Sequence, residues 1–467
     1  MTHAVATLVG ELCAQAGWAD PPLERLALTV SPKVLATPWP IAPMAMAALG
    51  ALGLAVSRLH ELRGGAPQSV HLDSRAAEIA MASSSYLEVA GRNAKFRDPF
   101  TGFYAARNGE FVFLHGNFPH LRDGLLALLK VPNEAQAIAQ AVARWDAGEL
   151  EAEAIKAGLC AAKVRERRAW QAAPQGEAIA GQGVLTLTQI GTAPPRVLEP
   201  GERLAGLRAL DLSRVIAGPM AARSLAEHGA QVLQIASPKL PFIESLVIDT
   251  GFGKRAAHLD LDTDAGRERL SALAAEADIV IDAYRPGALA ARGFGADALA
   301  LMRPGVVAVG LSAFSEQGPW GGRRGYDSLV QASIGMALEP GTDAPRLLPC
   351  QPLDYLTGYL AAFAALAGVL RSLTEGGSWQ ARLSLAATAN WMYEVRARLG
   401  DDRDVPDANP KAADLTDLLA EHQTAFGMVR AIVPALRIGD AATAWARPPV
   451  PLGSDAPIWP DRSRRCR

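Results

Sequence analysis

From residue 207 onward, short apolar runs alternate with stretches of helical composition, and this alternation constrains the fold more than any other feature. Strands are predicted at 207–212, 230–235, 278–282 and 305–312, with helices at 217–227 and 264–275. Alternation at this spacing is typical of parallel βαβ units with right-handed crossovers. The carboxyl ends of such strands form a ligand crevice. The sequence therefore predicts an α/β protein with a Rossmann-like parallel sheet.

Two proline-rich stretches, Pro194-Pro195 and Glu199-Pro200-Gly201, form the clearest boundary in the chain. The chain has 467 residues, of which 49% are hydrophobic and 20% charged, so it is long enough for several packed domains. We predict a helical, repeat-like segment at 1–98, a small α+β domain at 99–193 and a linker at 194–203. The main domain follows at 204–399, with a C-terminal extension at 400–467.

Charge and cysteine content limit the partners. The net charge of -2 argues against nucleic acid, and the basic end at 462–467 is interpreted as a frayed terminus. Cys13, Cys160, Cys350 and Cys466 are scattered, and no histidine pair has metal-ligand context, so neither a disulfide framework nor a metal site is predicted. No secretory signal is recognised, and the apolar run 43–56 is shorter than the roughly 20 residues that span a bilayer. The expectation is a cytoplasmic protein without a membrane segment, with 43–56 as a buried helix.

Residues 46–81 parallel residues 361–392. Both segments read as apolar helix, Gly-Gly turn, short strand and helix, and both contain Gly-Gly-x-x-Gln. The alternative is that two Ala-rich helices resemble each other through composition alone. Counted from the shared turn, the position of Asp354 in the second segment corresponds to Ala42 in the first, so only the second segment has a carboxylate there.

Asp354 is a lone carboxylate before a long Ala/Leu run, in which a buried helix is predicted at 356–371. An isolated Asp at such a position is typical of a helix N-cap, which stabilises a helix by about 1 kcal/mol. A reactive carboxylate is the second interpretation. The residues alone leave both open.

A set of motifs between Leu204 and Met392 resembles the class III CoA-transferases, the family of formyl-CoA and carnitinyl-CoA transferases that includes alpha-methylacyl-CoA racemase. The motifs are Leu-Arg-Ala-Leu-Asp-Leu-Ser-Arg-Val-Ile-Ala-Gly-Pro at 207–219, Gly253-Lys254-Arg255, Tyr284-Arg285-Pro286-Gly287, 314–319, Gly325-Tyr326-Asp327 and Asp354. Residues 100–170 resemble the small domain of that family, and 447–453 resemble its C-terminal end. The resemblance implies that 1–98 is a partial family copy. Because members are interlocked dimers, we expect a homodimer or an intrachain pseudo-dimer.

The resemblance implies a reaction at Asp354, with acyl-CoA and a small carboxylic acid as substrates and no permanently bound cofactor. Its carboxylate would attack an acyl-CoA thioester, and the mixed anhydride would then become an aspartyl-CoA thioester. The helix N-terminus is expected to keep this carboxylate ionised. A racemase is one alternative, but its usual His is Tyr326 here, whose phenol has an ordinary pKa near about 10. A degenerate CoA-binding or partner-binding protein is another, because Gln234-Ile235-Ala236 replaces the usual Lys-Val-Glu.

Six residues are predicted to bind CoA: Arg214, Ala217, Lys254, Arg255, Arg285 and Tyr326. The cations suit the phosphates, and Ala217 opens the first strand-to-helix turn, where backbone N–H groups can bind phosphate. For Lys254 and Arg255 the alternative is a solvated surface pair, and for the turn it is a purely structural role. Asp327 is predicted to cap a helix at 328–338. Residues 293–298 match GxGxxA but follow a helical stretch, so we predict no NAD site.

Overall fold

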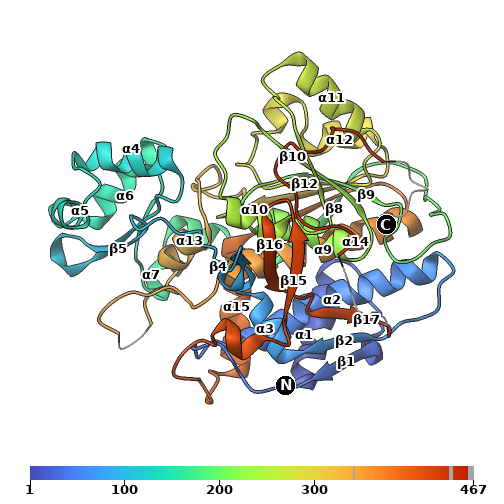
Figure 1. Ribbon diagram of the computed structural model, residues 1–467, viewed down its shortest axis with the longest axis horizontal. Helices are drawn as coiled ribbons and strands as arrows, with labels where there is room; N and C mark the ends of the chain where they lie inside the picture. Colours follow the sequence, from blue (N-terminus) through green and yellow to red (C-terminus); the bar gives the residue numbers. More distant parts are fainter. Residues whose placement is uncertain (340–341, 441–444, 461–467) are drawn as a thin grey trace.

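The computed structural model describes residues 1–339, 342–440 and 445–460 and is built around a seven-stranded sheet (Figure 1). The basic end at 462–467, which includes Cys466, lies outside the described residues. The strands of the sheet lie in the order β11 (Arg255–His258), β10 (Gln231–Ala236), β9 (Arg208–Leu212), β12 (Ile279–Asp282), β13 (Val307–Ser312), β14 (Ser378–Ser384) and β8 (Leu185–Gly191). Only β8 is antiparallel to its neighbour.

The six parallel strands have the doubly wound topology. Numbered from β9 along the chain, their spatial order is 3-2-1-4-5-6, with the reversal between β9 and β12. Alternate residues of β9 face opposite sides of the sheet: Ala209 packs in the large core beneath the sheet, whereas Leu210 and Leu212 pack in the second core. The Rossmann-like parallel sheet is confirmed, and ligands of such sheets bind where the strand order reverses.

Helices cover both faces of the sheet. The helices are α1 (Thr2–Gln15), α2 (Ile41–Leu62), α3 (Ser74–Ala80), α4 (Pro119–Leu129), α5 (Ala135–Val142), α6 (Ala147–Lys156), α7 (Arg167–Gln171), α8 (Pro174–Ala178), α9 (Ala217–Glu227), α10 (Glu244–Thr250), α11 (Asp264–Ala274), α12 (Ala296–Met302), α13 (Asp327–Ser333), α14 (Pro352–Thr374) and α15 (Leu385–Leu399). Helices α9 and α14 pack together beneath the sheet, whereas α11 and α12 contact each other on the other face. The predicted strands and helices of this region therefore stand within a few residues of their predicted ends.

The first part of the chain repeats the order of elements found at α14. Helix α2 is followed by a turn at Gly64-Gly65, strand β2 (Val70–Asp73) and helix α3, just as α14 is followed by a turn at Gly376-Gly377, β14 and α15. Strand β2 lies between β1 (Leu26–Thr29), to which it is parallel, and the antiparallel β17 (Leu436–Ile438). Strand β14 likewise lies between the parallel β13 and the antiparallel β8. The predicted element order is confirmed, while common ancestry of the two segments stays a prediction.

Two helices, α2 and α14, are long and apolar enough to cross a membrane by length and composition. In each, 94% of the most apolar window is buried inside the protein, and the two helices pack against each other. Both are therefore core helices, as predicted for 43–56 and 356–371.

A smaller unit lies to one side of the molecule (cyan in Figure 1). Its sheet contains β5 (Gly102–Ala105), β6 (Phe111–Leu114) and β7 (Ala161–Lys163), and helices α4, α5 and α6 pack on it. Its strands β6 and β7 contact α13 of the main region. The predicted domain boundaries remain predictions, but this unit falls within 99–193.

Segments from the two ends of the chain share sheets. The hairpin β15 (Leu419–Thr424) and β16 (Gly427–Ile432) extends a sheet with β3 (Glu88–Val89) and β4 (Arg92–Asn93). Strand β8 enters the main sheet from the first half, and β17 enters the β1–β2 sheet from the second half. The two halves are therefore interwoven within one polypeptide.

Candidate active site

A cavity of about 830 Å³ opens at the carboxyl ends of the parallel strands. Residues just after β9, β10, β11, β12 and β13 line it, so it lies where the topology predicts a ligand site. Phe118, Pro119 and His120 of the small unit form part of its wall. Asp354, at the start of α14, also lines the cavity.

Asp354 is the third residue of α14 and is 7% exposed. The N-cap residue is Gln351, so the interpretation of Asp354 as the N-cap is wrong. The carboxylate lies beside Ala217, the first residue of α9, whose backbone N–H lowers the pKa of Asp354. The carboxylate is therefore aimed at the first turn of a neighbouring helix, where an anion is stabilised by the helix dipole.

Asp327 holds the N-terminus of α14 in place. Its Oδ2 accepts hydrogen bonds from the backbone N–H groups of Leu353 (2.9 Å) and Asp354 (3.1 Å), and its Oδ1 accepts one from Gln331. The expectation that Asp327 caps the helix that follows it is therefore wrong, since α13 begins at Asp327 itself and the side chain reaches α14 instead. Asp327 thus fixes the backbone of Asp354.

Burial raises the pKa of Asp354 well above its usual value, and the neighbouring Asp327 carboxylate raises it further. The Ala217 N–H lowers the pKa but does not offset these two effects. Burial also raises the pKa of Asp327. The sequence predicted that the N-terminus of its own helix keeps Asp354 ionised. Burial and the neighbouring carboxyl group outweigh this effect, because two carboxyl groups in one buried site cannot both ionise easily.

The loop between β9 and α9 is strained and tightly packed around this carboxylate. Val215 has φ +74°, a backbone conformation that is unusual for a β-branched residue. A Cβ atom on Gly218 would lie 2.3 Å from the Ser213 Cβ, and one on Gly358 of α14 would lie 2.8 Å from the Ala217 carbonyl oxygen. Glycine at these two positions lets α14 and the loop approach closely.

Two of the predicted phosphate-binding cations line the cavity. Arg214 follows β9, donates from Nη2 to the Pro241 carbonyl oxygen and lies 5.3 Å from the Phe118 ring. Arg285 follows β12 and is exposed, and among the described residues its side chain forms no ion pair or hydrogen bond. Both guanidinium groups are therefore placed where a phosphate group could contact them.

Lys254 and Arg255 do not face the cavity. They lie at the amino end of β11, opposite the carboxyl ends that form the crevice. The Lys254 Nζ is buried, 2.7 Å from Asp211 Oδ2 and 2.7 Å from the Pro219 carbonyl oxygen, while Arg255 pairs with Asp455 at 3.2 Å. A phosphate-binding role for either residue does not fit this geometry, and the surface-pair alternative is also wrong for Lys254.

Tyr326 lines the cavity, as predicted, and its ring stacks on His115 with centroids 4.2 Å apart. Burial is the main cause that raises the pKa of its phenol. Burial also lowers the pKa of His115 to about 3, so this imidazole is neutral. Neither group is suited to remove a proton at neutral pH, which counts against racemisation.

Several cavity residues were not predicted from the sequence. Lys239 and Arg292 pair with acidic residues after β11, at 2.7 Å from Asp260 and 3.0 Å from Asp262. His120 and Arg324 complete the basic wall. The sequence signal for Lys239 was its place soon after β10, at the carboxyl edge of the sheet, whereas His120 is brought in only by tertiary packing.

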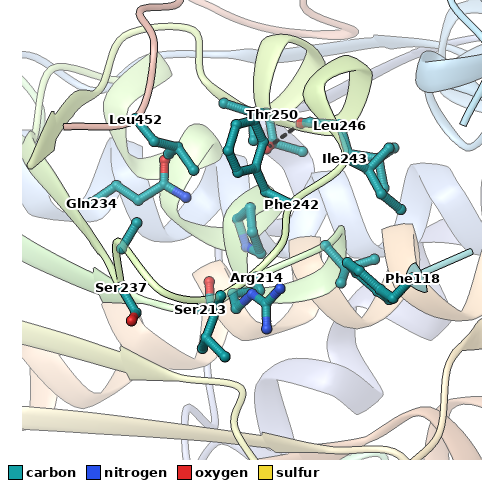
Figure 2. A pocket seen from close by; sticks show the side chains of 15 residues that line it. Phe118, Ser213, Arg214, Gln234, Ser237, Phe242, Ile243, Leu246, Thr250 and Leu452 are labelled. Atoms are coloured by element: carbon teal, nitrogen blue, oxygen red, sulfur yellow. Dashed lines mark hydrogen bonds between the residues drawn. The ribbon is translucent and has the colours of Figure 1, made fainter. Parts of the chain in front are cut away.

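A smaller pocket of about 40 Å³ shares lining residues with the cavity and is lined in part by side chains of the segment 237–243 (Figure 2). Gln234 and Ala236, which replace the charged residues of the resembled family, line it together with the exposed Phe242. Arg214 and Phe118 line both the cavity and the smaller pocket. Within the described residues no cluster of three or more His, Cys, Asp or Glu side chains could hold a metal ion.

Comparison with known proteins gives the same family as the motifs. Residues 204–417 match the model of CoA-transferase family III, and this region is therefore similar to that family. The six parallel strands of the main sheet and Asp354 lie within the matched residues.

The matching relatives are longer than the matched region. The chain is 34% identical over 201 residues to the acetyl-coenzyme A transferase nodX of Hypoxylon pulicicidum, covering 41% of this chain and 34% of the relative. It is 29% identical over 233 residues to the probable fatty acyl-CoA transferase Rv3272 of Mycobacterium tuberculosis, covering 46% and 59%. The crystal structure of Rv3272 aligns with a TM-score of 0.40 over 43% of this chain and 59% of that one. The chain thus spans between about a third and three fifths of these relatives.

Proposed function

We propose that this protein is a CoA-transferase that moves CoA from an acyl-CoA donor to a carboxylic acid acceptor through Asp354. The observation that carries the proposal is the placement of one buried carboxylate at the inner wall of a basic cavity, at the carboxyl ends of a doubly wound sheet. The cavity is large enough for a nucleotide-bearing substrate. The names of the relatives, all acyl-CoA or CoA transferases, support the same reaction class.

The proposed reaction begins when an Asp354 carboxylate oxygen attacks the thioester carbonyl of the donor. The C–S bond breaks, CoA leaves as a thiolate, and a mixed anhydride remains on Asp354. The thiolate then attacks the Asp354 carboxyl carbon, which releases the donor acid and leaves an aspartyl-CoA thioester. The acceptor carboxylate attacks this thioester, and the same steps in reverse form the new acyl-CoA and free Asp354.

The surroundings of Asp354 support this sequence of steps. The Ala217 N–H, which lowers the pKa of the carboxyl group, can donate to an oxygen that gains negative charge during attack. The raised pKa lowers the ionised fraction at neutral pH, but a buried carboxylate that does ionise is poorly solvated and basic. Arg214 and Arg285 would bind phosphates of CoA, which holds the thioester toward α14.

Replacement of Asp354 by Asn tests the proposal, because Asn has nearly the same shape and no nucleophilic oxygen. We expect Asp354→Asn to abolish transfer between acyl-CoAs and acids, measured by mass spectrometry, with CoA affinity retained. Asp264→Asn, at an exposed carboxylate of α11, is the matched control and should stay active. Hydroxylamine added during turnover should modify Asp354 in the unaltered protein.

Full activity of Asp354→Asn, after deamidation is excluded by mass spectrometry, would refute the assignment. CoA binding without any transfer in the unaltered protein would instead support a degenerate CoA-binding function. Exchange of an α-proton with solvent without transfer would support a racemase.

A further inference from the structure

Tyr355 is a buried residue in the first turn of α14 to which the proposed chemistry gives no role. It directly follows Asp354, and it is 0% exposed. Its hydroxyl group donates a hydrogen bond to Asp249 Oδ2 (3.1 Å) and accepts one from the backbone N–H of Ser84 (2.8 Å). Burial raises the pKa of the phenol, so the hydroxyl group stays protonated and remains a donor. The residue after the reactive carboxylate is therefore held at two points.

Asp249 connects the two helices that meet at the reactive carboxylate. It is 0% exposed, and besides the bond from Tyr355 it accepts bonds from Arg223 Nη1 of α9 (3.3 Å) and from Ser83 Oγ (2.5 Å). Helix α9 begins beside the carboxylate of Asp354. A buried carboxylate whose hydrogen bonds are satisfied in this way is held rigidly. Asp249 thus fixes α9 and the first turn of α14 relative to each other.

The partners in this network come from separate parts of the chain. The two serines belong to the 3-10 helix η2 (Ser83–Tyr86) in the first half, whereas Asp249 belongs to α10. Helix α10 also lines the smaller pocket with Leu246 and Thr250 (Figure 2). The network therefore links the first half and the pocket wall to the helix that carries the nucleophile.

A hydrogen-bonded tyrosine beside a nucleophile can stabilise the fold or aim the nucleophile, and the two roles have different effects on rate. A loss of stability lowers the amount of folded protein but leaves the kcat of the folded molecules unchanged. Loss of aim lowers kcat itself, because a displacement of the reacting atoms by about 1 Å can cost about 100-fold in rate. Tyr359, one turn later in α14, is also buried and makes none of these hydrogen bonds, so it provides the comparison.

We propose that the Tyr355 hydroxyl group is a positioning group for Asp354, which holds the first turn of α14 so that the carboxylate stays aimed at the thioester carbonyl. Tyr355 does not line the cavity, so it acts through Asp354 and not on the substrate. The first half of the chain thus contributes to the reaction through the Ser84 N–H as well as to the cavity wall. This inference rests on the proposed CoA-transferase function and adds a positioning residue to it.

Replacement of Tyr355 by Phe removes the hydroxyl group and keeps the buried ring. We expect kcat for transfer to fall about ten- to 100-fold in Tyr355→Phe, with the KM for acyl-CoA and the affinity for CoA within about twofold of the unaltered protein. Tyr359→Phe is the matched control and should keep its kcat, because it removes the same group one turn farther along α14. Rates are expressed per CoA-binding site, so that a loss of folded protein is not counted as a loss of catalysis.

The outcomes separate the positioning role from the function on which it rests. An unchanged kcat per site in Tyr355→Phe, or an equal loss in Tyr359→Phe, would overturn the positioning role and leave CoA transfer standing. If Tyr355→Phe does not fold, Ser83→Ala takes its place, because it removes another bond to Asp249. A lower kcat at constant KM in Ser83→Ala would support the role, and an unchanged kcat would overturn it.

If the unaltered protein transfers no CoA, the proposed function fails and the reactivity of Asp354 is measured directly. The rate at which a water-soluble carbodiimide labels Asp354 is then followed by mass spectrometry. Faster labelling in Tyr355→Phe than in Tyr359→Phe would support the positioning role, because the loosened turn exposes the carboxyl group. Equal labelling rates in the two variants would overturn it.

Discussion

Replacement of Lys254 by Met distinguishes a structural lysine from a phosphate ligand. Lys254 is 1% exposed, and its ammonium group contacts the fully buried Asp211 and the Pro219 carbonyl oxygen. Asp211 also accepts hydrogen bonds from the backbone and side chain of Ser213. The ion pair thus joins the start of β11 to β9 and α9 beneath the cavity.

Removal of one partner from such a pair leaves an uncompensated buried charge, which costs about 3 to 5 kcal/mol. We expect Lys254→Met to lose about this much unfolding free energy in guanidinium titrations. The double variant Lys254→Met/Asp211→Asn should recover most of it, because no buried charge remains and Asn can still accept from Ser213.

Ligand binding provides the second readout. A charge-assisted contact to phosphate contributes about 1.5 to 3 kcal/mol, or about ten- to 150-fold in affinity. Arg285→Ala should therefore weaken CoA far more than pantetheine with little change in stability, whereas Lys254→Met should leave the CoA-to-pantetheine ratio within about twofold. Unchanged stability of Lys254→Met together with a selective loss of CoA affinity would refute the structural assignment.

Three further predictions concern the carboxyl pair and the packing around it. Asp327→Asn should shift the acid limb of the kcat/KM profile to lower pH, because the charge that raises the pKa of Asp354 is gone; an unmoved limb would exclude that cause. Asp354→Asn should raise the Tm at pH 7 to 8 but not at pH 3. A carboxyl group whose pKa is raised in the folded state stabilises the fold while it is protonated, and this stabilisation is lost as the pH rises above its ordinary pKa of about 3.9. A Tm gain of equal size at both pH values would contradict a raised pKa of Asp354 in the folded protein. Gly358→Ala should lose about 1 to 3 kcal/mol of stability, because the added Cβ would press on the Ala217 carbonyl oxygen. Gly322→Ala is the control and should keep its stability, because open space surrounds that position. Equal effects of the two changes in a thermal melt would argue against tight packing of α9 on α14.

The sheet was largely predictable because its strands are short, buried and separated by amphipathic helices. Strand β9 and helix α9 stand within one residue of their predicted bounds. Strand β8 was not predicted to join this sheet, because it is an edge strand that lies far in the sequence from β14, with which it pairs. Local sequence shows that a segment is extended but not which sheet receives it.

The site was partly predictable for a similar reason. Residues that follow a parallel strand, such as Arg285, lie at the edge of the sheet that forms the crevice. Lys254 precedes β11, so the same rule would have placed it at the opposite edge of the sheet. Contacts between distant segments were not predictable: His120 enters from the small unit, and Asp327 reaches the next helix instead of its own.

The side chains that line the cavity come from opposite halves of one polypeptide, with Phe118 and His120 from the first half and the buried carboxylate of Asp354 from the second. Their approach is therefore an intramolecular event, whose effective concentration is set by the connecting chain and not by the amount of protein. Dilution cannot separate these two parts of the cavity.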